Sequence, residues 1–405
     1  MTTMTRFIAF LLVLASTIHP CVASRSDNIN VDIKDNDHHH YHNGGNDDDY
    51  DETLFLQIPD PSIARSHLKF ITSEPHVAGT KGDQVMSDYV VKALEEAGIP
   101  NVSTFDLDVL LNYPESPPKV TLWSTSSTGD KDTMLFDAPL SEDILSQDDT
   151  SDTSWRNHTF HGYSPSGHVK RAPLVYANYG RPSDFNALME ANIPVNGTVV
   201  LVRYGKCFRG LKVRNAQRLG ALAVLIYSDP ADDGYGVVVD DGDGTYPDGP
   251  WRPASGVQRG SVQFNSACAG DPMRADERYQ HANINTTVQD LCGVSSYKDL
   301  IPSIPSLPIS YGDATPLLQL LRGPLAKDVG GDDSCGGITN LTYRVGPSSS
   351  SVYVEVKVQN KQEIRSVPNV VGVIPGTLPP EQDMPVLLGN HRDAWVYGAA
   401  DPNSG

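Results

Sequence analysis

The sequence predicts an α/β fold that is interrupted by a β-rich insertion. Residues 368–374 and 385–388 are short, nearly continuous apolar runs, which are typical of strands covered on both faces of an α/β sheet. Between residues 118 and 362, clusters of Pro, Gly, Ser and Asp recur and the apolar runs shorten, which indicates a β-rich segment. The fold class expected is therefore an α/β sheet domain with a second domain inserted into its chain.

The N-terminal residues have the pattern of a targeting segment. Residues 1–24 combine Arg6, an apolar stretch over 7–18 and a small-residue exit, and this stretch of 12 residues is shorter than the ~20 that a spanning helix needs. A cleaved signal peptide is therefore favoured over an anchor. Residues 25–52 hold few apolar side chains and many acidic and histidine residues, which predicts a disordered tail.

Ordered elements are expected from residue 53 onward. Helical patterns cover residues 61–70 and 82–97, and Gly98 is a natural stop for the second helix. Residues 102–111 have the pattern of a strand.

A compact βαβ unit is predicted inside the insertion. Its strands lie over residues 198–204 and 221–227, with a helix over 208–219 between them and a turn at Gly220. Near the end of the insertion, residues 351–358 alternate strictly between valine and other side chains, which predicts a half-buried strand.

The composition and the short motifs of the chain indicate which binding partners and which cellular compartment to expect. The chain has 405 residues, 39% hydrophobic content and a net charge of −19, so it can form globular domains but would repel a nucleic-acid backbone. With the signal peptide, the N-glycosylation tripeptides predict a secreted or secretory and vacuolar location. These tripeptides begin at Asn101, Asn157, Asn196, Asn285 and Asn340.

Four cysteines remain after the predicted cleavage: Cys207, Cys268, Cys292 and Cys335. They are compatible with two disulfides or none, and their spacing does not choose among the three pairings. The absence of a Cys-x-x-Cys sequence argues against a structural zinc knuckle.

Candidate chemistry gathers at residues 389–405. His391 follows a predicted buried strand, and ligands bind at the carboxyl ends of strands in open α/β sheets. Asp401 lies ten residues further on, and zinc accepts both imidazole nitrogen and carboxylate oxygen. Asp393 is placed to accept the second N–H of the imidazole. On spacing alone, the alternative is an ordinary surface cluster of charges followed by a turn.

The string His-Arg-Asp-Ala-Trp-Val-Tyr-Gly-Ala-Ala-Asp-Pro-Asn-Ser-Gly over residues 391–405 resembles the metal-site signature of the glutamate carboxypeptidase II family. These proteins are folate- and N-acetylated-dipeptide-cleaving relatives of the zinc aminopeptidases. Other stretches are similar in the same order, so the resemblance runs from about residue 54 to residue 405. They are residues 75–80, 108–114, 203–210, 227–232, 256–260 and 302–305.

The resemblance implies an architecture and a site. A peptidase domain of zinc-aminopeptidase type would be built from residues 53–117 and 363–405, with a protease-associated apical domain over 118–362. His391 would hold one zinc ion and Asp401 would bridge two Zn²⁺ ions. Arg209 would contact the carboxylate of a small peptide substrate, with Lys206 beside it in the same loop.

This sequence departs from the family in two places. Ser261 stands where the family has an asparagine that reads the distal glutamate carboxylate, and residues 273–276 lack the Thr and Tyr of the family's Ca²⁺ site. These departures put both glutamate specificity and a Ca²⁺ site in doubt.

In the family, the Glu-Glu pair with the general base, the remaining zinc ligands and the dimerising helices follow the part matched here. We therefore expect this chain to be an N-terminal fragment that is inactive alone, with no catalytic residue of its own. A homodimer is expected only with the C-terminal helices present.

The expected function of the whole protein is that of a zinc exopeptidase, which removes C-terminal residues from small peptides in the secretory or vacuolar lumen. The alternative is a transferrin-receptor-like binding protein without catalysis. Retained His391 and Asp401 favour the enzyme, and a Glu-Glu pair soon after Gly405 in the gene would decide between the two.

Overall fold

The computed structural model describes residues 57–129, 131–147, 151–152, 158–233, 244–249, 251–273, 288–379 and 381–395. The predicted signal peptide, the acidic tail, Asp401, Asn157 and Asn285 lie outside these residues. The chain forms two compact units. One comprises Met1–Ile71, Val90–Ser103 and Val371–His391, and the other comprises Thr72–Tyr89, Thr104–Val370 and Arg392–Gly405. No helix in the described residues has the length and apolar character to cross a bilayer.

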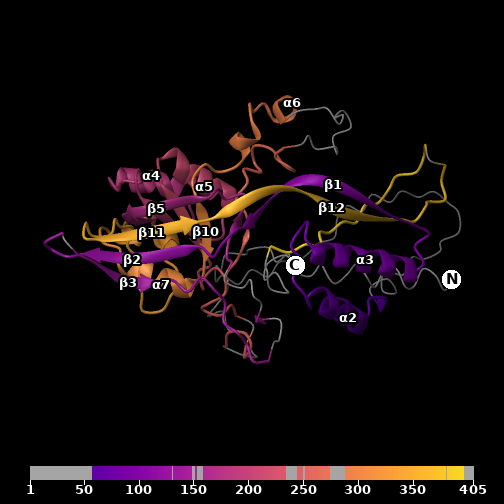
Figure 1. Ribbon diagram of the computed structural model, residues 1–405, viewed down its shortest axis with the longest axis horizontal. Helices are drawn as coiled ribbons and strands as arrows, with labels where there is room; N and C mark the ends of the chain where they lie inside the picture. The colour runs from indigo at the N-terminus through magenta and orange to yellow at the C-terminus, as the bar shows by residue number, and fades with distance from the viewer. Residues whose placement is uncertain are drawn as a thin grey trace, which may run out of the picture. The chain divides into compact units, whose positions relative to one another are not determined.

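The two N-terminal helices agree with the sequence prediction. Helix α2 covers Pro61–Ile71, and the carboxylate of Asp60 accepts hydrogen bonds from the backbone N–H and the hydroxyl of Ser62 at 2.8 and 2.7 Å. Helix α3 covers Lys81–Glu96 and is followed by Gly98, whose φ of 82° lies in the left-handed region that glycine adopts readily. Figure 1 shows both helices.

Two long strands of the chain pair with each other. Strand β1, Asn101–Pro114, pairs with strand β12, Asn360–Val373, and only Gln359 separates β12 from strand β11, Val352–Val358 (Figure 1). The predicted strand over residues 102–111 is therefore confirmed and is longer than expected.

The insertion contains an antiparallel sheet with the strand order β3-β2-β11-β5. Its other strands are β2, Lys119–Thr125, β3, Asp132–Asp137, and β5, Gly167–Ala172. In β11 the side chains of Val354, Val356 and Val358 are buried, and Glu355 and Lys357 between them are more exposed. Tyr353, which precedes Val354, is buried as well. The half-buried strand expected from the valine alternation is confirmed.

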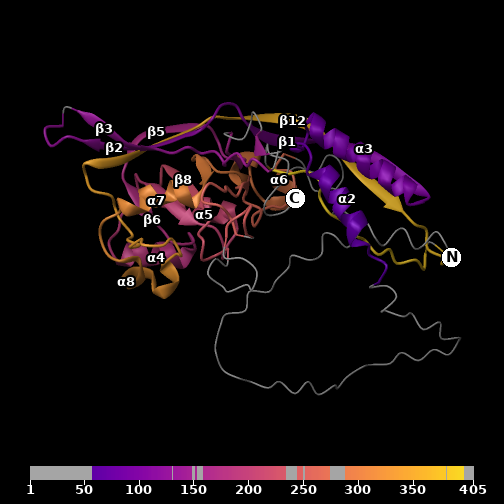
Figure 2. The same ribbon diagram turned by 90° about the horizontal axis from the view of Figure 1, so that it is seen from below.

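A parallel sheet with the order β10-β8-β7-β6 forms the second layer of the insertion (Figure 2). The predicted βαβ unit is confirmed as β7, α5 and β8. The α/β character is confirmed as well, and the insertion adds helices and parallel strands to the antiparallel ones. The elements are β6 Leu174–Tyr176, α4 Pro182–Glu190, β7 Val199–Arg203, α5 Arg209–Arg218, β8 Ala223–Tyr227, β10 Ser306–Ile309 and α7 Tyr311–Gln319.

Short elements complete the insertion. Strands β4, His161–Gly162, and β9, Gly260–Ser261, form a parallel pair. The remaining helical turns are α6 Val288–Cys292, η4 Tyr297–Leu300, α8 Ala326–Gly330 and η5 Asp332–Ser334.

One hydrophobic core joins both sheets of the insertion. It contains Val356 from β11, Leu201 from β7 and Leu317 from α7, all fully buried. Burying apolar surface contributes roughly 25 cal/mol per Å², so this shared core is the main source of stability for the insertion.

The strand predicted over residues 385–388 is wrong for this chain. Val386 and Leu387 are each 88% exposed, and the segment has no regular structure. A strand needs a hydrogen-bonded neighbour, and among the described residues none pairs with this run. Val373 and Ile374, at and just beyond the end of β12, are also about half exposed at 47% and 54%, so burial on both faces is not observed there.

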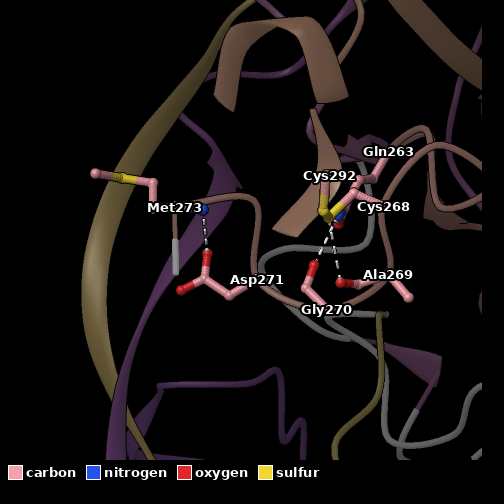
Figure 3. The surroundings of a disulfide bond; sticks show 7 residues. All are labelled: Gln263, Cys268, Ala269, Gly270, Asp271, Met273 and Cys292. Carbon is pink, nitrogen blue, oxygen red and sulfur yellow. Dashed lines mark hydrogen bonds between the residues drawn. A yellow bond between two sulfur atoms is a disulfide. The ribbon is translucent and has the colours of Figure 1, made fainter. Parts of the chain in front are cut away.

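The described residues contain one disulfide, so the prediction of two or none is wrong. Cys268 and Cys292 are bonded, with their Cα atoms 5.6 Å apart (Figure 3), whereas Cys207 and Cys335 are free thiols. The amide of Gln263 donates to the carbonyl of Gly270 at 2.7 Å close to this crosslink. The bond therefore ties α6 to the turn that follows β9.

Candidate active site

The predicted site residues lie in different surroundings. His391 and Lys206 are exposed, Asp393 and Arg209 are half-buried, and Asp401 lies outside the described residues. Within the described part of the chain, no three His, Cys, Asp or Glu side chains come close enough to hold a metal ion. The imidazole of His391 is a suitable zinc ligand by its chemistry. Its predicted partner, Asp401, is not among the described residues.

The segment that follows His391 is anchored by a buried ion pair. The guanidinium of Arg392 donates to the carboxylate of Asp83 at 2.9 Å and to the carbonyl of Pro368. Asp83 is only 1% exposed and also accepts the backbone N–H of Gly79 at 2.9 Å. Arg392 is thereby fixed to the first turn of α3.

Asp83 was missed by the sequence analysis, although a signal for it exists. Thr80-Lys81-Gly82-Asp83 has the spacing of a helix-capping sequence, in which the acidic side chain bonds back to the backbone before the helix. Burial raises the pKa of Asp83, while the N–H of Gly79 and the charge of Arg392 act in the opposite direction. The negative charge of Asp393 raises the pKa further, so Asp393 lies within electrostatic reach of Asp83.

The last two described residues, Ala394 and Trp395, pack against distant parts of the chain. Ala394 is 1% exposed, and its N–H donates to the carbonyl of His76 at 3.3 Å. The ring of Trp395 stands edge-on to Phe160 with 6.1 Å between centroids. It also covers Gly162, where a Cβ atom would overlap the indole ring.

The turn over residues 75–80 is held by side chains from two distant strands. The hydroxyl of Tyr113 in β1 donates to the carbonyl of Ala78 at 2.6 Å. Arg365 in β12 donates to the carbonyl of Gly79 at 3.3 Å and lies 4.7 Å above the ring of Tyr113. Motifs that the sequence analysis found separately therefore meet in one place.

The second predicted cluster surrounds Arg209 at the start of α5. Its Nε donates to the carbonyl of Ser261 at 3.0 Å, and the guanidinium lies directly against Gly260, where a Cβ atom would collide with it. Gly260 has a φ of 135°, a backbone conformation that favours glycine. Among the described residues, no hydrogen bond or ion pair uses the two terminal nitrogens of Arg209, which suits them for bidentate binding of a carboxylate.

A buried histidine lies beside this arginine and was not predicted. His161 is fully buried, with Nδ1 2.8 Å from the hydroxyl of Ser306 and Nε2 3.0 Å from the hydroxyl of Tyr204. Because the Tyr204 hydroxyl donates to the carbonyl of Gln258 at 2.6 Å, it accepts a proton from Nε2. Burial, reinforced by the charge of Arg209, holds the pKa of His161 well below its usual range, so the ring is neutral.

Three predicted glycosylation residues are described, and each is exposed: Asn101, Asn196 and Asn340. Asn101 begins β1, Asn196 lies in the turn before β7, and Asn340 has a φ of 60° in a loop. Exposure is what attachment of a glycan requires, and occupancy remains a prediction.

The middle of the chain is similar to a known domain family. The PA domain family matches residues 169–263, within the predicted insertion. Among solved structures, a peptidase M28 precursor from Shewanella amazonensis is 16% identical, with a TM-score of 0.39, covering 83% of this chain and 55% of its own.

Curated relatives are similar to this chain over most of its length. A probable glutamate carboxypeptidase from Arthroderma benhamiae is 37% identical over 87% of this chain and 46% of its own length. A glutamate carboxypeptidase 2 homolog from Caenorhabditis elegans is 33% identical over 84% and 42%, and aminopeptidase NAALADL1 from Rattus norvegicus is 33% identical over 85% and 44%. The predicted resemblance is confirmed, and this chain is related to the glutamate carboxypeptidases over most of its length. It spans less than half the length of these relatives.

Proposed function

We propose that the whole protein is a zinc exopeptidase that releases the C-terminal residue of small peptides in the secretory or vacuolar lumen. Two relatives that cover more than four-fifths of the chain are named as glutamate carboxypeptidases. The observation that carries the proposal to this chain is Arg209, whose terminal nitrogens are uncommitted within the described residues and whose place is fixed by Ser261 and Gly260. A guanidinium in this state matches the free carboxylate that marks a peptide's C-terminus.

The metal ligands in the proposal are His391 and Asp401, with Asp393 orienting the imidazole. Bound zinc would polarise the scissile carbonyl and lower the pKa of a bound water. The chain's own part is to hold the segment 392–395 through Asp83 and His76, so that the ligands on either side start from a fixed backbone. With two proposed ligands and no proposed general base, we expect the 405-residue chain alone not to hydrolyse peptides.

Calcium is not part of the proposal. The carboxylate of Asp271 accepts the N–H of Met273 at 3.0 Å (Figure 3) and that of Leu110 at 3.4 Å. It therefore closes a turn and ties that turn to β1, which is sufficient reason for its place in the fold.

Metal analysis and hydrolysis of the full-length protein test the metal assignment. We expect His391→Ala to lower bound zinc and to abolish hydrolysis of peptides with a free C-terminus. Unchanged zinc content would contradict the role given to His391. If the wild-type protein bound no zinc and cleaved no peptide, the transferrin-receptor-like alternative would replace the enzyme.

Substrate recognition needs a separate test, because one relative is named an aminopeptidase. We expect Arg209→Met to raise KM for a dipeptide with a free C-terminal carboxylate and to leave the corresponding amide unaffected. The matched control is Arg218→Met, an exposed arginine in the last turn of the same helix. Preferential cleavage of the C-terminal amide, lost when the amino terminus is blocked, would support aminopeptidase action instead.

A further inference from the structure

Helix α5 carries a buried lysine that the proposed function does not use. Lys212 is 0% exposed, and its ammonium donates to the carbonyl of Tyr179 at 2.6 Å and to the carbonyl of Gly205 at 2.7 Å. Lysine is almost never fully buried without partners, because removing the charge from water is costly. Here the partners are two backbone carbonyls, so the ammonium connects two separate turns of the chain.

The charged groups around Lys212 come from several elements. Burial lowers the pKa of Lys212 to about 8, while Cys207, Asp184 and Asp232 act in the opposite direction. The ring of Tyr179 lies 5.6 Å from the ammonium. Lys212 is therefore charged at neutral pH despite its burial.

The loop that Lys212 holds has an unfavourable backbone. Gly205 and Lys206 both have positive φ values, 92° and 61°, and a non-glycine residue in this region is uncommon. The carbonyl of Gly205 lies at this bend and accepts a hydrogen bond from the ammonium of Lys212. Such a conformation persists only where the surrounding structure determines it.

The second partner, Tyr179, is itself fixed. Its hydroxyl donates to Asp232 at 2.6 Å, and the guanidinium of Arg203 lies 3.9 Å from its ring. Arg203 is 2% exposed and also donates to Asn178 at 3.1 Å. Lys212 thus ties the bent loop at Gly205 and Lys206 to the buried cluster around Tyr179. In the sequence, Lys212 lies three residues after Arg209.

We propose that Lys212 is a positioning residue for recognition of the substrate's carboxylate: it fixes the bend at Gly205 and Lys206 and thereby holds Arg209 against Gly260. This inference rests on the proposed function, in which Arg209 binds that carboxylate. Without the ammonium, the loop can relax from its positive φ values, and the guanidinium loses its fixed place.

Lys212→Met in the full-length protein tests the proposal, because methionine is close in length and lacks the donors. For a dipeptide with a free C-terminal carboxylate, we expect KM to rise about tenfold, with kcat nearly unchanged. For the C-terminal amide of the same dipeptide we expect no change. In the double variant, Lys212→Met should raise KM little beyond the value for Arg209→Met alone. An equal loss on both substrates, or no change on either, would overturn the proposal.

The pH profile separates positioning from simple packing. In the wild type, KM for the carboxylate substrate should rise above pH 8 as Lys212 loses its charge, and the Lys212→Met profile should be flat there. Cys207→Ser should keep the wild-type rise. If Cys207→Ser abolishes the rise, the pH role given to Lys212 is wrong.

Hydrogen exchange distinguishes failure of this inference from failure of the proposed function. If wild-type protein does not discriminate between carboxylate and amide, the proposed role of Arg209 fails, whatever Lys212 does. The effect of Lys212 on the loop is then measured by hydrogen exchange of the backbone amides of residues 205–209. Faster exchange confined to that loop in Lys212→Met supports the proposal, and unchanged exchange overturns it.

Discussion

Arg392 donates a hydrogen bond of 2.9 Å to Asp83, although 309 residues separate them in the sequence. Asp83 is nearly inaccessible, and the side chain of Arg392 is only 18% exposed. This pair joins the residue after the predicted metal ligand to the first turn of α3.

Removing one partner of this pair should destabilise the fold. We expect Asp83→Ala to lower the free energy of unfolding by about 3 kcal/mol, because the charge of Arg392 would stay buried without its partner. Urea denaturation measures the change. The control is Glu96→Ala, which breaks an exposed pair with Lys92 and should cost less than about 0.5 kcal/mol. Equal effects of the two substitutions would contradict the importance given to Asp83.

Asp83 should also give the fold a pH dependence. Its pKa is raised in the folded state above the ordinary 3.8, so the folded protein binds this proton more tightly than the unfolded chain does. Stability should therefore fall as pH rises from 3.8 through the raised pKa. Relative to Asp83→Asn, the wild type should lose stability across that interval. Parallel pH profiles of the two proteins would contradict this expectation.

Gly162 should be sensitive to substitution because it lies against the ring of Trp395. We expect Gly162→Ala to destabilise the chain by roughly 1–3 kcal/mol, because the new methyl group would overlap the indole ring. The matched control is Gly389→Ala, where no atom lies within 4 Å of the added Cβ. Thermal or urea unfolding of both variants checks the difference. A neutral Gly162→Ala would mean that Trp395 does not pack there.

Local patterns predicted the elements that local interactions determine. The stop of α3 at Gly98, the βαβ unit around α5 and the valine alternation of β11 depend on neighbours within a few residues. Residues 385–388 failed because an apolar run becomes a strand only when another strand pairs with it, and pairing is a property of the whole sheet.

The buried charges were missed for a related reason. Lys212 lies in a helix rich in Arg, Asn and Gln, a composition typical of a solvent-exposed face. Only the turns at Tyr179 and Gly205, which fold over the helix, remove it from water. The capping spacing of Asp83 was visible in the sequence, but its partner Arg392 is set by tertiary structure.

The disulfide gives a chemical prediction. Under non-reducing conditions, Cys207 and Cys335 should react with an alkylating reagent in the denatured chain, and Cys268 and Cys292 should react only after reduction. Replacing both bonded cysteines with serine should lower stability by about 3 kcal/mol, since the bond closes a loop across a separation of 24 residues. Peptide mapping that recovers a different pair would contradict the assignment.

Two predicted glycosylation sites should differ in when they can be modified. The transferase must read the threonine of each tripeptide as well as its asparagine. Thr198 is 1% exposed and donates to the carbonyl of Val195 at 2.8 Å, whereas Thr342 is exposed. Glycan can therefore reach Asn196 only before β7 folds, but it can reach Asn340 at any time.

Modification of folded, unglycosylated protein tests this difference. With a microsomal transferase and a lipid-linked oligosaccharide donor, we expect Asn340 to be modified and Asn196 to stay bare. During synthesis into microsomes, both should be modified. Asn196→Gln and Asn340→Gln assign the mass shifts. Equal modification of both residues in the folded protein would show that Thr198 becomes accessible without unfolding of the sheet. The burial of Thr198 directly before the central strand β7 argues against that result.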